Sequence, residues 1–324
     1  MNTNFRKIGL LFLAFATFAS CDNTDGDDVK ITPPSASEFA AVREDALAGR
    51  TQHFTATAGT GNIVLTSAKG VKINLNGDCL KKAGVAVTGT IDIEYVELFD
   101  KGDMLVTNKP TMGLMPDGKK NLLISGGEFY IKATQNGQDL TTSCGMYLIV
   151  PTGLTGGFDN QMTLWFGNID EEDNLVWREA KDGAGGKGGV QGEANSYYVT
   201  FGNFGWANVD RFYSDTRPKT TILVDAPEGF DNTNSAVYLS YDGEGTNALA
   251  QLDTYTAAGL FSEHYGQIPV GLACHIIFAT EENGQWRYAI KGVTTTANAV
   301  YSFTLAETKV GSEAQLVAAI NAIQ

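Results

Sequence analysis

The sequence contains few histidines and few cysteines for a chain of 324 residues. Its three histidines are His53, His264 and His275, and none forms the H-E-x-x-H motif or another spacing typical of metal ligands. The chain also has no G-x-S-x-G nucleophile motif and no complete EF-hand calcium loop. We therefore expect a protein without catalytic residues, bound metal or cofactor.

Positive charge is also scarce. The chain has 23 Lys and Arg against 37 Asp and Glu, which gives a formal net charge of −14 at pH 7. Such a surface repels phosphate backbones. We expect no nucleic-acid partner.

An apolar run near the start is too short to span a bilayer. Residues 8–18 are eleven residues without a charge, and the basic residues Arg6 and Lys7 precede them. The small residues Ala19 and Ser20 follow, as at a signal-peptidase site. This pattern predicts a signal peptide over residues 1–20.

The sequence Phe18-Ala19-Ser20-Cys21 resembles a bacterial lipobox, with Phe18 where that pattern usually begins with Leu. The resemblance implies that Cys21 becomes the acylated N-terminus and that a lipid anchor makes the membrane a partner. Simple secretion, with Cys21 at this place by chance, is the alternative.

An acidic tract follows the predicted lipid site. Four carboxylates, Asp22, Asp25, Asp27 and Asp28, stand within seven residues that have too little apolar content to bury. The tract is typical of a solvated spacer. It also resembles the export tract of Bacteroidota surface lipoproteins, which implies an outer-membrane lipoprotein that faces outward. A periplasm-facing protein is the alternative.

Three further cysteines remain, Cys79, Cys144 and Cys274. At most one intramolecular pair can form among them in an oxidising compartment. Cys79 and Cys144 could pair, but nothing in the sequence shows that their side chains converge. Cys274 lies in an apolar run, where a buried inert thiol is expected.

Apolar and polar residues alternate along most of the chain, which indicates half-buried strands. The clearest segments are 71–75, 90–95, 129–134, 146–150, 197–201, 236–241, 273–280 and 286–290. Residues 162–166 and 175–177 indicate a hairpin whose tip is 170–174. Two capping-box patterns, Ser35 with Glu38 and Ser312 with Gln315, predict one helix near each end. We expect Gly49 to end the first of these helices.

The predicted fold is all-β, with two antiparallel β-sandwich domains in tandem, a short N-terminal helix and a C-terminal helix. The expected segments, after the signal peptide, are an acidic tether and helix over 21–50, a first sandwich over 51–203, a linker over 204–219 and a second sandwich with its helix over 220–324.

The stretch from Val87 to Thr111, with Asp103 and Met104, and the Gly126-Gly127-Glu128 motif after it carry a family resemblance. They resemble a module of Bacteroidota surface lipoproteins that is similar to the spectrin-binding sandwich of ankyrins and netrin receptors, over residues 55–200. In that group a linker like GWANVDRFY leads to a domain similar to the transthyretin-like regulatory module of carboxypeptidases. The resemblance implies display or contact, and it carries over no catalytic residue.

Aromatic residues supply the candidate binding positions. Trp165 is expected on the surface, because Met162, Leu164 and Phe166 have the opposite parity, so Trp165 is the candidate for stacking on a sugar. Trp206, with Asp210 and Arg211, is expected to fix the angle between the two domains.

The sequence thus indicates a non-catalytic, lipid-anchored envelope protein that acts in display, adhesion or assembly, with an envelope protein or a glycan as partner. A glycan-binding lipoprotein of a polysaccharide-uptake system is the first alternative. A hydrolase with an unrecognised pair of carboxylates is the second, since their separation is three-dimensional information.

Overall fold

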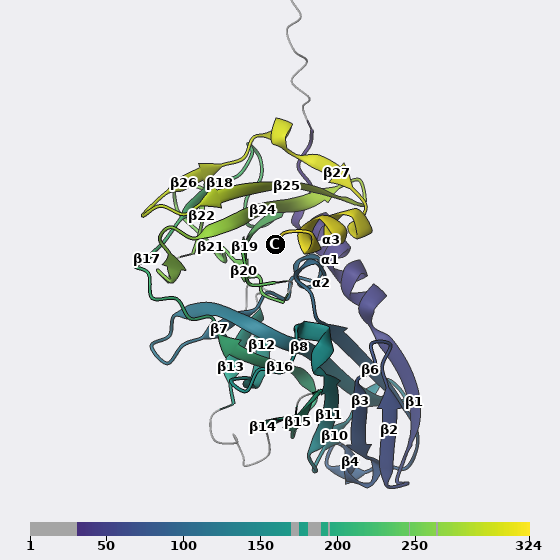
Figure 1. Ribbon diagram of the computed structural model, residues 1–324. Coiled ribbons are helices and arrows are strands. Elements are labelled where there is room, and N and C mark those ends of the chain that lie inside the picture. Colours follow the sequence, from purple (N-terminus) through teal and green to yellow (C-terminus); the bar gives the residue numbers. More distant parts are fainter. Residues whose placement is uncertain (1–30, 170–174, 181–188, 194, 246, 264) are drawn as a thin grey trace, which may run out of the picture. The chain divides into compact units, whose positions relative to one another are not determined.

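A computed structural model of the chain describes residues 31–169, 175–180, 189–193, 195–245, 247–263 and 265–324. Residues 33–324 form one compact unit. All the helices and strands that follow belong to it (Figure 1). Cys21 and the acidic tract lie outside the described residues, as does the predicted hairpin tip 170–174.

Strands make up about half of the described chain and the helices are few and short, so the predicted all-β class with a helix near each end is confirmed. Nearly all described strand pairs are antiparallel, and two are parallel, β13 (Leu175–Glu179) with β7 (Met112–Leu114) and β18 (Leu223–Asp225) with β26 (Val300–Ser302). Below, residues 51–213 are called the first half and residues 217–324 the second half.

The first half holds three sheets. The largest has the order β1-β6-β8-β16-β12-β13-β7, with β9 beside β8, the second β14-β15-β11-β3-β2, and the third β10-β4-β5. The other strands are β1 (Gln52–Ala58), β2 (Asn62–Thr66), β3 (Lys72–Asn76), β4 (Leu80–Lys82), β5 (Val85–Ala86), β6 (Gly89–Leu98), β8 (Lys120–Gln135), β9 (Gln138–Asp139), β10 (Thr141–Thr142), β11 (Met146–Pro151), β12 (Thr163–Ile169), β14 (Gly189–Glu193), β15 (Ser196–Phe201) and β16 (Gly205–Phe212).

Strand β7 closes part of the largest sheet on itself. It pairs with β8 on one side and with β13 on the other, so β8, β16, β12, β13 and β7 form a ring. Leu123, Trp165, Leu175 and Trp177, which come from three strands of this ring, form a separate small core. Because of this closure, side chains on both faces of β12 are buried, with Trp165 in the small core of the ring and Leu164 on the opposite face.

The first two sheets face each other as a sandwich. Alternate residues of β15 (Tyr197, Val199 and Phe201) and of β6 (Ile91, Ile93 and Tyr95) are buried. Gly126 of β8 lies so close to β15 that a Cβ atom there would be 3.3 Å from the Tyr197 ring. The period-2 patterns seen in the sequence therefore mark residues that face this shared core.

The second half holds sheets with the orders β20-β19-β24-β25-β27, β21-β22-β18-β26 and β17-β23. The remaining strands are β17 (Lys219–Thr220), β19 (Ser235–Tyr241), β20 (Ala250–Gln251), β21 (Thr254–Tyr255), β22 (Phe261–Ser262), β23 (Ile268–Pro269), β24 (Ala273–Glu282), β25 (Gln285–Thr294) and β27 (Lys309–Gly311).

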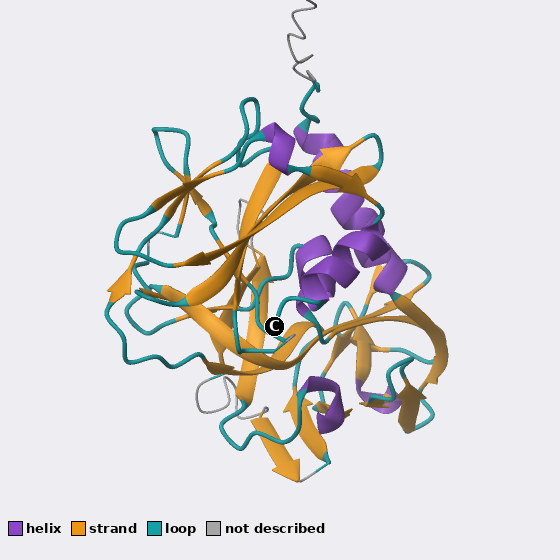
Figure 2. Cartoon of the chain, turned by 45° about the horizontal axis from the view of Figure 1, so that its top comes forward, coloured by secondary structure: helices purple, strands orange, loops and turns teal. Residues whose placement is uncertain are grey.

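Three helices lie together between the sheets of the two halves (Figures 1 and 2). They are α1 (Ala36–Arg50), α2 (Lys101–Val106) and α3 (Glu313–Asn321). Both predicted capping boxes are present, at the first turns of α1 and α3. Gly49 does not end α1, which continues to Arg50, and α2 had no counterpart in the sequence patterns. Among the described residues, no helix has both the length and the apolar composition needed to cross a membrane.

One hydrophobic core joins the helices to both halves. It contains Phe39 of α1, Leu98 of β6, Ile277 of β24 and Ile320 of α3, all nearly or fully buried. Phe39 meets Trp286 of β25 edge to face, with ring centroids 6.2 Å apart. The helix that follows the predicted tether is therefore part of the folded body, and it packs against the sheet of the second half.

The structure differs from the predicted linker 204–219. Residues 205–212 form β16, which lies between β8 and β12 in the largest sheet. Alternating residues in this segment, such as Ala207 and Val209, are buried by the neighbouring strands, which an open linker would not provide.

Candidate functional site at the junction of the two halves

The residues predicted for membrane attachment and export lie outside the described part of the chain. They are Cys21, Asp22, Asp25, Asp27 and Asp28, and their roles stay predictions.

Trp165 is not on the surface, and the predicted position is wrong. Its side chain is 1 % exposed, lies edge to face against Phe212 with centroids 5.0 Å apart, and donates its Nε1 hydrogen to the Asp210 carbonyl oxygen at 3.0 Å. Leu164, on the other face of β12, is buried as well. The parity argument failed because the closed ring supplies a core on the face that was expected to meet solvent.

Trp206 packs where the aromatic residues of the first half meet the shared core. Its ring centroid lies 5.2 Å from that of Tyr130 and 6.4 Å from that of Trp177, and Lys109 Nζ lies 5.8 Å from it. The ring also packs against the core shared by both halves. Its predicted role in fixing the two domains stays a prediction, and these contacts are the ones through which it would act.

Arg211 lines a cavity of about 590 Å³ between segments of the two halves. The first half contributes segment 155–160 together with Ile124, Met162 and Arg211, and the second half contributes segment 243–245 together with Asn247. We call this space the junction cavity. Its volume falls within the range of about 300–1,000 Å³ that is common for small-molecule sites.

An ion pair forms part of its wall. Arg211 Nε donates to Asp159 Oδ2 at 2.6 Å, and Arg211 Nη1 makes a long bond of 3.4 Å to the Phe212 carbonyl. Burial alone would raise the pKa of Asp159, but the bonds from Arg211 and from the backbone N–H of Gln161 lower it below its ordinary value. Among the described residues, nothing accepts a hydrogen bond from Arg211 Nη2.

A buried tyrosine holds the loop that carries Asp159. The Tyr197 hydroxyl accepts from the Asp159 backbone N–H at 2.7 Å and donates to the Gly157 carbonyl at 3.4 Å. The Gly157 N–H in turn donates to the Thr152 carbonyl at 2.9 Å. This wall of the cavity is therefore fixed by the sandwich core beneath it.

The wall from the second half is tied to the first half by paired backbone and side-chain bonds. Asn247 Nδ2 donates to the Ser125 carbonyl at 2.6 Å, and the Ser125 N–H donates to the Asn247 carbonyl at 3.0 Å. Glu244 is partly exposed, and its carboxylate bonds to none of the described residues. The junction cavity thus combines a fixed frame with polar groups that are not used by the fold.

A buried polar chain leads from this frame to two carboxyl groups. Ser125 Oγ donates to Asn208 Oδ1 at 2.9 Å, and Asn208 Nδ2 donates to Asp210 Oδ2 at 2.5 Å. Glu128, opposite Asn208 in the sheet, has no hydrogen-bond partner for either carboxyl oxygen among the described residues.

Both carboxyl groups are fully buried, and burial raises the pKa of Glu128 and of Asp210 well above the ordinary carboxyl range. The charge of Asp210 raises the pKa of Glu128 further, and Lys109 opposes this. A glycoside hydrolase needs two carboxylates in an open cleft, whereas these two are closed off from solvent.

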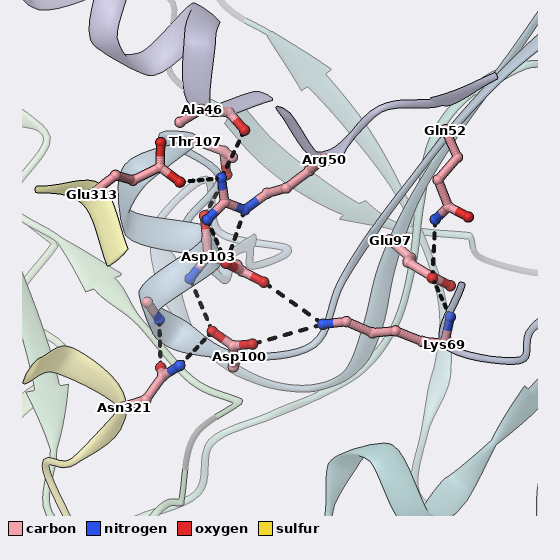
Figure 3. A network of polar contacts seen from close by, with 11 residues as sticks. Ala46, Arg50, Gln52, Lys69, Glu97, Asp100, Asp103, Thr107, Glu313 and Asn321 are labelled. Carbon is pink, nitrogen blue, oxygen red and sulfur yellow. Dashed lines mark hydrogen bonds and ion pairs between the residues drawn. The ribbon is translucent and has the colours of Figure 1, made fainter. Parts of the chain in front are cut away.

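A second polar network fastens the three helices to one another (Figure 3). Arg50 at the end of α1 bonds to Asp103 Oδ1 of α2 at 2.6 Å and to Glu313 Oε1 of α3 at 2.8 Å. Lys69 lies 3.7 Å from the other oxygen of Asp103, and Asn321 of α3 donates to Asp100, the residue before α2. Two of these contacts, Arg50 with Glu313 and Asn321 with Asp100, join segments that are more than 200 residues apart in sequence.

Lys101 of α2 is fully buried and reaches into the second half. Its Nζ donates to Ser240 Oγ at 2.9 Å, to the Gly245 carbonyl at 3.0 Å and to the Ile323 carbonyl at 2.8 Å. Burial lowers the pKa of this amine. Because Gly245 also lines the junction cavity, Lys101 supports that wall from behind.

The cysteines of the folded body have structural positions. Cys79 and Cys144 form a disulfide, which settles the pairing that the sequence left open. Cys274 is fully buried, as expected, and burial raises the pKa of its thiol to about 12. His275 bonds through Nδ1 to Asp242 at 2.8 Å.

No protein-family model matches the chain, and no curated protein matches it significantly. Within the part of the chain that the structure describes, no group of three or more His, Cys, Asp or Glu residues is placed to hold a metal ion.

Exposed apolar side chains gather on one sheet of the first half. Tyr147 of β11 and Tyr198 of β15 are 41 % and 38 % exposed, and Val64 of β2 is 56 % exposed. Val64 and Tyr147 both lie beside Asn74 of β3, and Tyr198 lies opposite Ile149, so all of them are on the same side of the sheet. We call this surface the outer face of sheet β14-β15-β11-β3-β2.

Proposed function

We propose that this chain is a lipid-anchored envelope protein that acts by contact, in display, adhesion or assembly, and performs no reaction. The observation that carries the proposal is the placement of α1, the first helix after the predicted tether. Phe39 and Ala46 of α1 are buried in the shared core, and Arg50 is paired with α2 and α3. Force applied to the predicted tether would therefore act on a helix that is packed into the hydrophobic core and paired with two other helices.

Attachment and exposure are supported by the sequence, through Cys21 and the acidic tract after it. The test is to express the full chain and the Cys21→Ser variant and to follow labelled palmitate, membrane fractionation and cleavage by protease added to intact cells. We expect label, membrane retention and cleavage for the wild-type chain, and loss of label and retention for the variant. A wild-type chain that takes up no palmitate would overturn the anchor, and a labelled chain resistant to protease would overturn the outward orientation.

A contact role is supported by the outer face that carries Val64, Tyr147 and Tyr198. Exposed aromatic residues in a contiguous patch are common at protein contact surfaces. A photo-crosslinking residue at Tyr147, activated on living cells, should give a discrete adduct. The same residue at Val300, which is 58 % exposed on another sheet, is the matched control. Absence of an adduct from Tyr147, or equal adducts from both positions, would contradict this contact role.

A glycan-binding lipoprotein is the second candidate, and the junction cavity favours it. Trp165, the side chain on which this function first rested, is buried. The junction cavity instead offers an aromatic ring, an arginine and free carboxylate and amide groups.

A further inference from the structure

We infer that the junction cavity is a binding site for a neutral saccharide, held between Phe158, Asp159 and Arg211 of the first half and Glu244 and Asn247 of the second. This inference rests on the second candidate function and gives it a site. It is independent of the proposed attachment to the membrane.

The lining has the two kinds of surface that a sugar ring presents to a protein. A pyranose has hydroxyl groups around its edge and apolar C–H groups on its faces. Phe158 is 42 % exposed at the cavity, while its ring centroid lies 5.7 Å from that of the buried Tyr197 beneath it. The same ring packs against Gly192 of β14, where an added Cβ would clash with Phe158 Cε2. Tyr197 and Gly192 therefore hold the ring in place, and its exposed part is available to a C–H face.

The polar groups suit hydroxyls, which both donate and accept hydrogen bonds. Glu244 offers carboxylate oxygens that accept from hydroxyl hydrogens, and Asn160 is an exposed amide that can do both. Arg211 Nη2 offers a donor to a hydroxyl oxygen, and the bond between Asp159 and Arg211 Nε fixes the direction of the guanidinium plane.

Charge restricts the class of ligand. Two carboxylates, Asp159 and Glu244, accompany the single cation Arg211, and the whole chain has a formal net charge of −14. Polyanions such as nucleic acids and sulfated glycans would be repelled. A neutral saccharide is not repelled by the negative charge. Its hydroxyl groups can still form hydrogen bonds with the charged side chains, and these are stronger than hydrogen bonds between neutral groups.

Hydrogen bonds within the protein hold the frame of the site. Tyr197 fixes the loop at Gly157 and Asp159, and Ser125 fixes Asn247. Gly157 has a φ of 116°, a backbone conformation that residues with a side chain rarely adopt. No atom lies within 4 Å of the position that a Cβ would take there. A saccharide can therefore come close to the backbone at Gly157. Because the loop and Asn247 are already held by hydrogen bonds, binding would cost little conformational entropy of the protein.

The test uses the full chain, purified in detergent and applied to an array that carries neutral, uronic-acid and sulfated oligosaccharides. Titration calorimetry with a neutral oligosaccharide from the array then measures Kd for the wild type, Glu244→Gln and Phe158→Ala. We expect signals from neutral oligosaccharides and a Kd raised about tenfold or more in each variant, the effect of losing one hydrogen bond to a charged group or one ring contact. Glu228→Gln removes the same charge from an exposed position outside the cavity and should bind like the wild type.

The possible results separate the site from the function. Equal Kd values for the wild type and both cavity variants would overturn the junction cavity as the site and leave glycan binding in place. Signals confined to uronic-acid or sulfated glycans would overturn the ligand class. An array without signal would overturn both the site and the glycan-binding function, while the palmitate and protease results would stand on their own. Unchanged unfolding midpoints show that the variants are folded.

Discussion

Arg50 Nη2 lies 2.6 Å from Asp103 Oδ1, and this ion pair joins the last turn of the first helix to α2. Both side chains are only 16 % exposed, so neither charge is well solvated by water. Removing one partner of such a pair leaves the other with an unfavourable, partly buried charge. The pair therefore contributes more to the attachment of α1 than an exposed ion pair would.

Replacing Asp103 by Asn should lower the free energy of unfolding by about 1–3 kcal/mol, because Arg50 would lose its charged acceptor while the shape of the site is kept. Urea denaturation of the wild-type and variant proteins measures this. Lys132 and Asp139 form a matched exposed pair, with side chains 35 % and 74 % exposed, and Asp139→Asn should change stability by less than about 0.5 kcal/mol. Equal small effects for both variants would mean that the Arg50 pair does not stabilise the helix cluster.

The disulfide between Cys79 and Cys144 closes a long stretch of the first half, with a sequence separation of 65. Cross-linking of this kind restricts the unfolded chain, and the double variant Cys79→Ser/Cys144→Ser should lose about 2–4 kcal/mol of stability. Thermal unfolding of the wild-type protein with and without a reducing agent tests the same contribution, because the unfolding midpoint should fall when the disulfide is reduced. Cys274→Ala is the control, because this variant keeps the disulfide and its midpoint should still fall when the reducing agent is added. A double variant as stable as the oxidised wild type would contradict the prediction.

The sequence allowed the elements with a local signal to be predicted. Ser35 with Glu38 and Ser312 with Gln315 marked both terminal helices, because a capping box needs only residues three apart. Alternation marked strands such as β6, β19 and β24 for the same reason. Helix α2 has only the N-cap Asp100, whose side chain accepts from the Asp103 N–H, and its six residues are too few for an amphipathic repeat, so burial of Lys101 and Met104 holds it.

The features that depend on distant contacts could not be predicted. Closure of the ring requires β7 to pair with β13, about sixty residues later, and this closure is what buries Trp165. The junction cavity likewise brings segment 155–160 to segment 243–245, and neither segment has a motif that indicates the other. Arg211 was singled out in the sequence for its place near a domain boundary, and the structure places it in the cavity wall instead of in a linker.

Lys101 supplies the third prediction, because one amine satisfies three acceptors from separate segments. Lys101→Met keeps the length of the side chain and leaves Ser240, Gly245 and Ile323 without their donor. We expect a loss of about 2–4 kcal/mol, since buried acceptors without partners are costly. Ser240→Ala removes only one acceptor and should cost about 1 kcal/mol. Chemical denaturation of the two variants compares them, and a Lys101→Met protein as stable as Ser240→Ala would argue against the threefold role of the amine.

Glu128 and Asp210 should make stability depend on pH. Burial raises the pKa of both carboxyl groups, so the native protein keeps their protons at pH values where the unfolded chain, with carboxyl pKa values near 4, has released them. The native state then binds more protons than the unfolded state, and stability falls as pH rises through this range, from the unfolded carboxyl pKa up to the raised native pKa. Glu128→Gln removes one of the two groups and the repulsion between them, so its stability should fall less steeply between pH 5 and pH 8.

Urea unfolding at pH 5, 6.5 and 8 measures these slopes, with Glu228→Gln as an exposed control that should run parallel to the wild type. At pH 8 we expect Glu128→Gln to exceed the wild type in stability by about 1–3 kcal/mol, and at pH 5 the difference should shrink. Parallel curves for Glu128→Gln and the wild type would contradict the prediction. Since Asn208 and Ser125 connect Asp210 to Asn247 in the wall of the junction cavity, loss of stability at high pH should be accompanied by weaker saccharide binding, which the same calorimetric titration at pH 8 would detect.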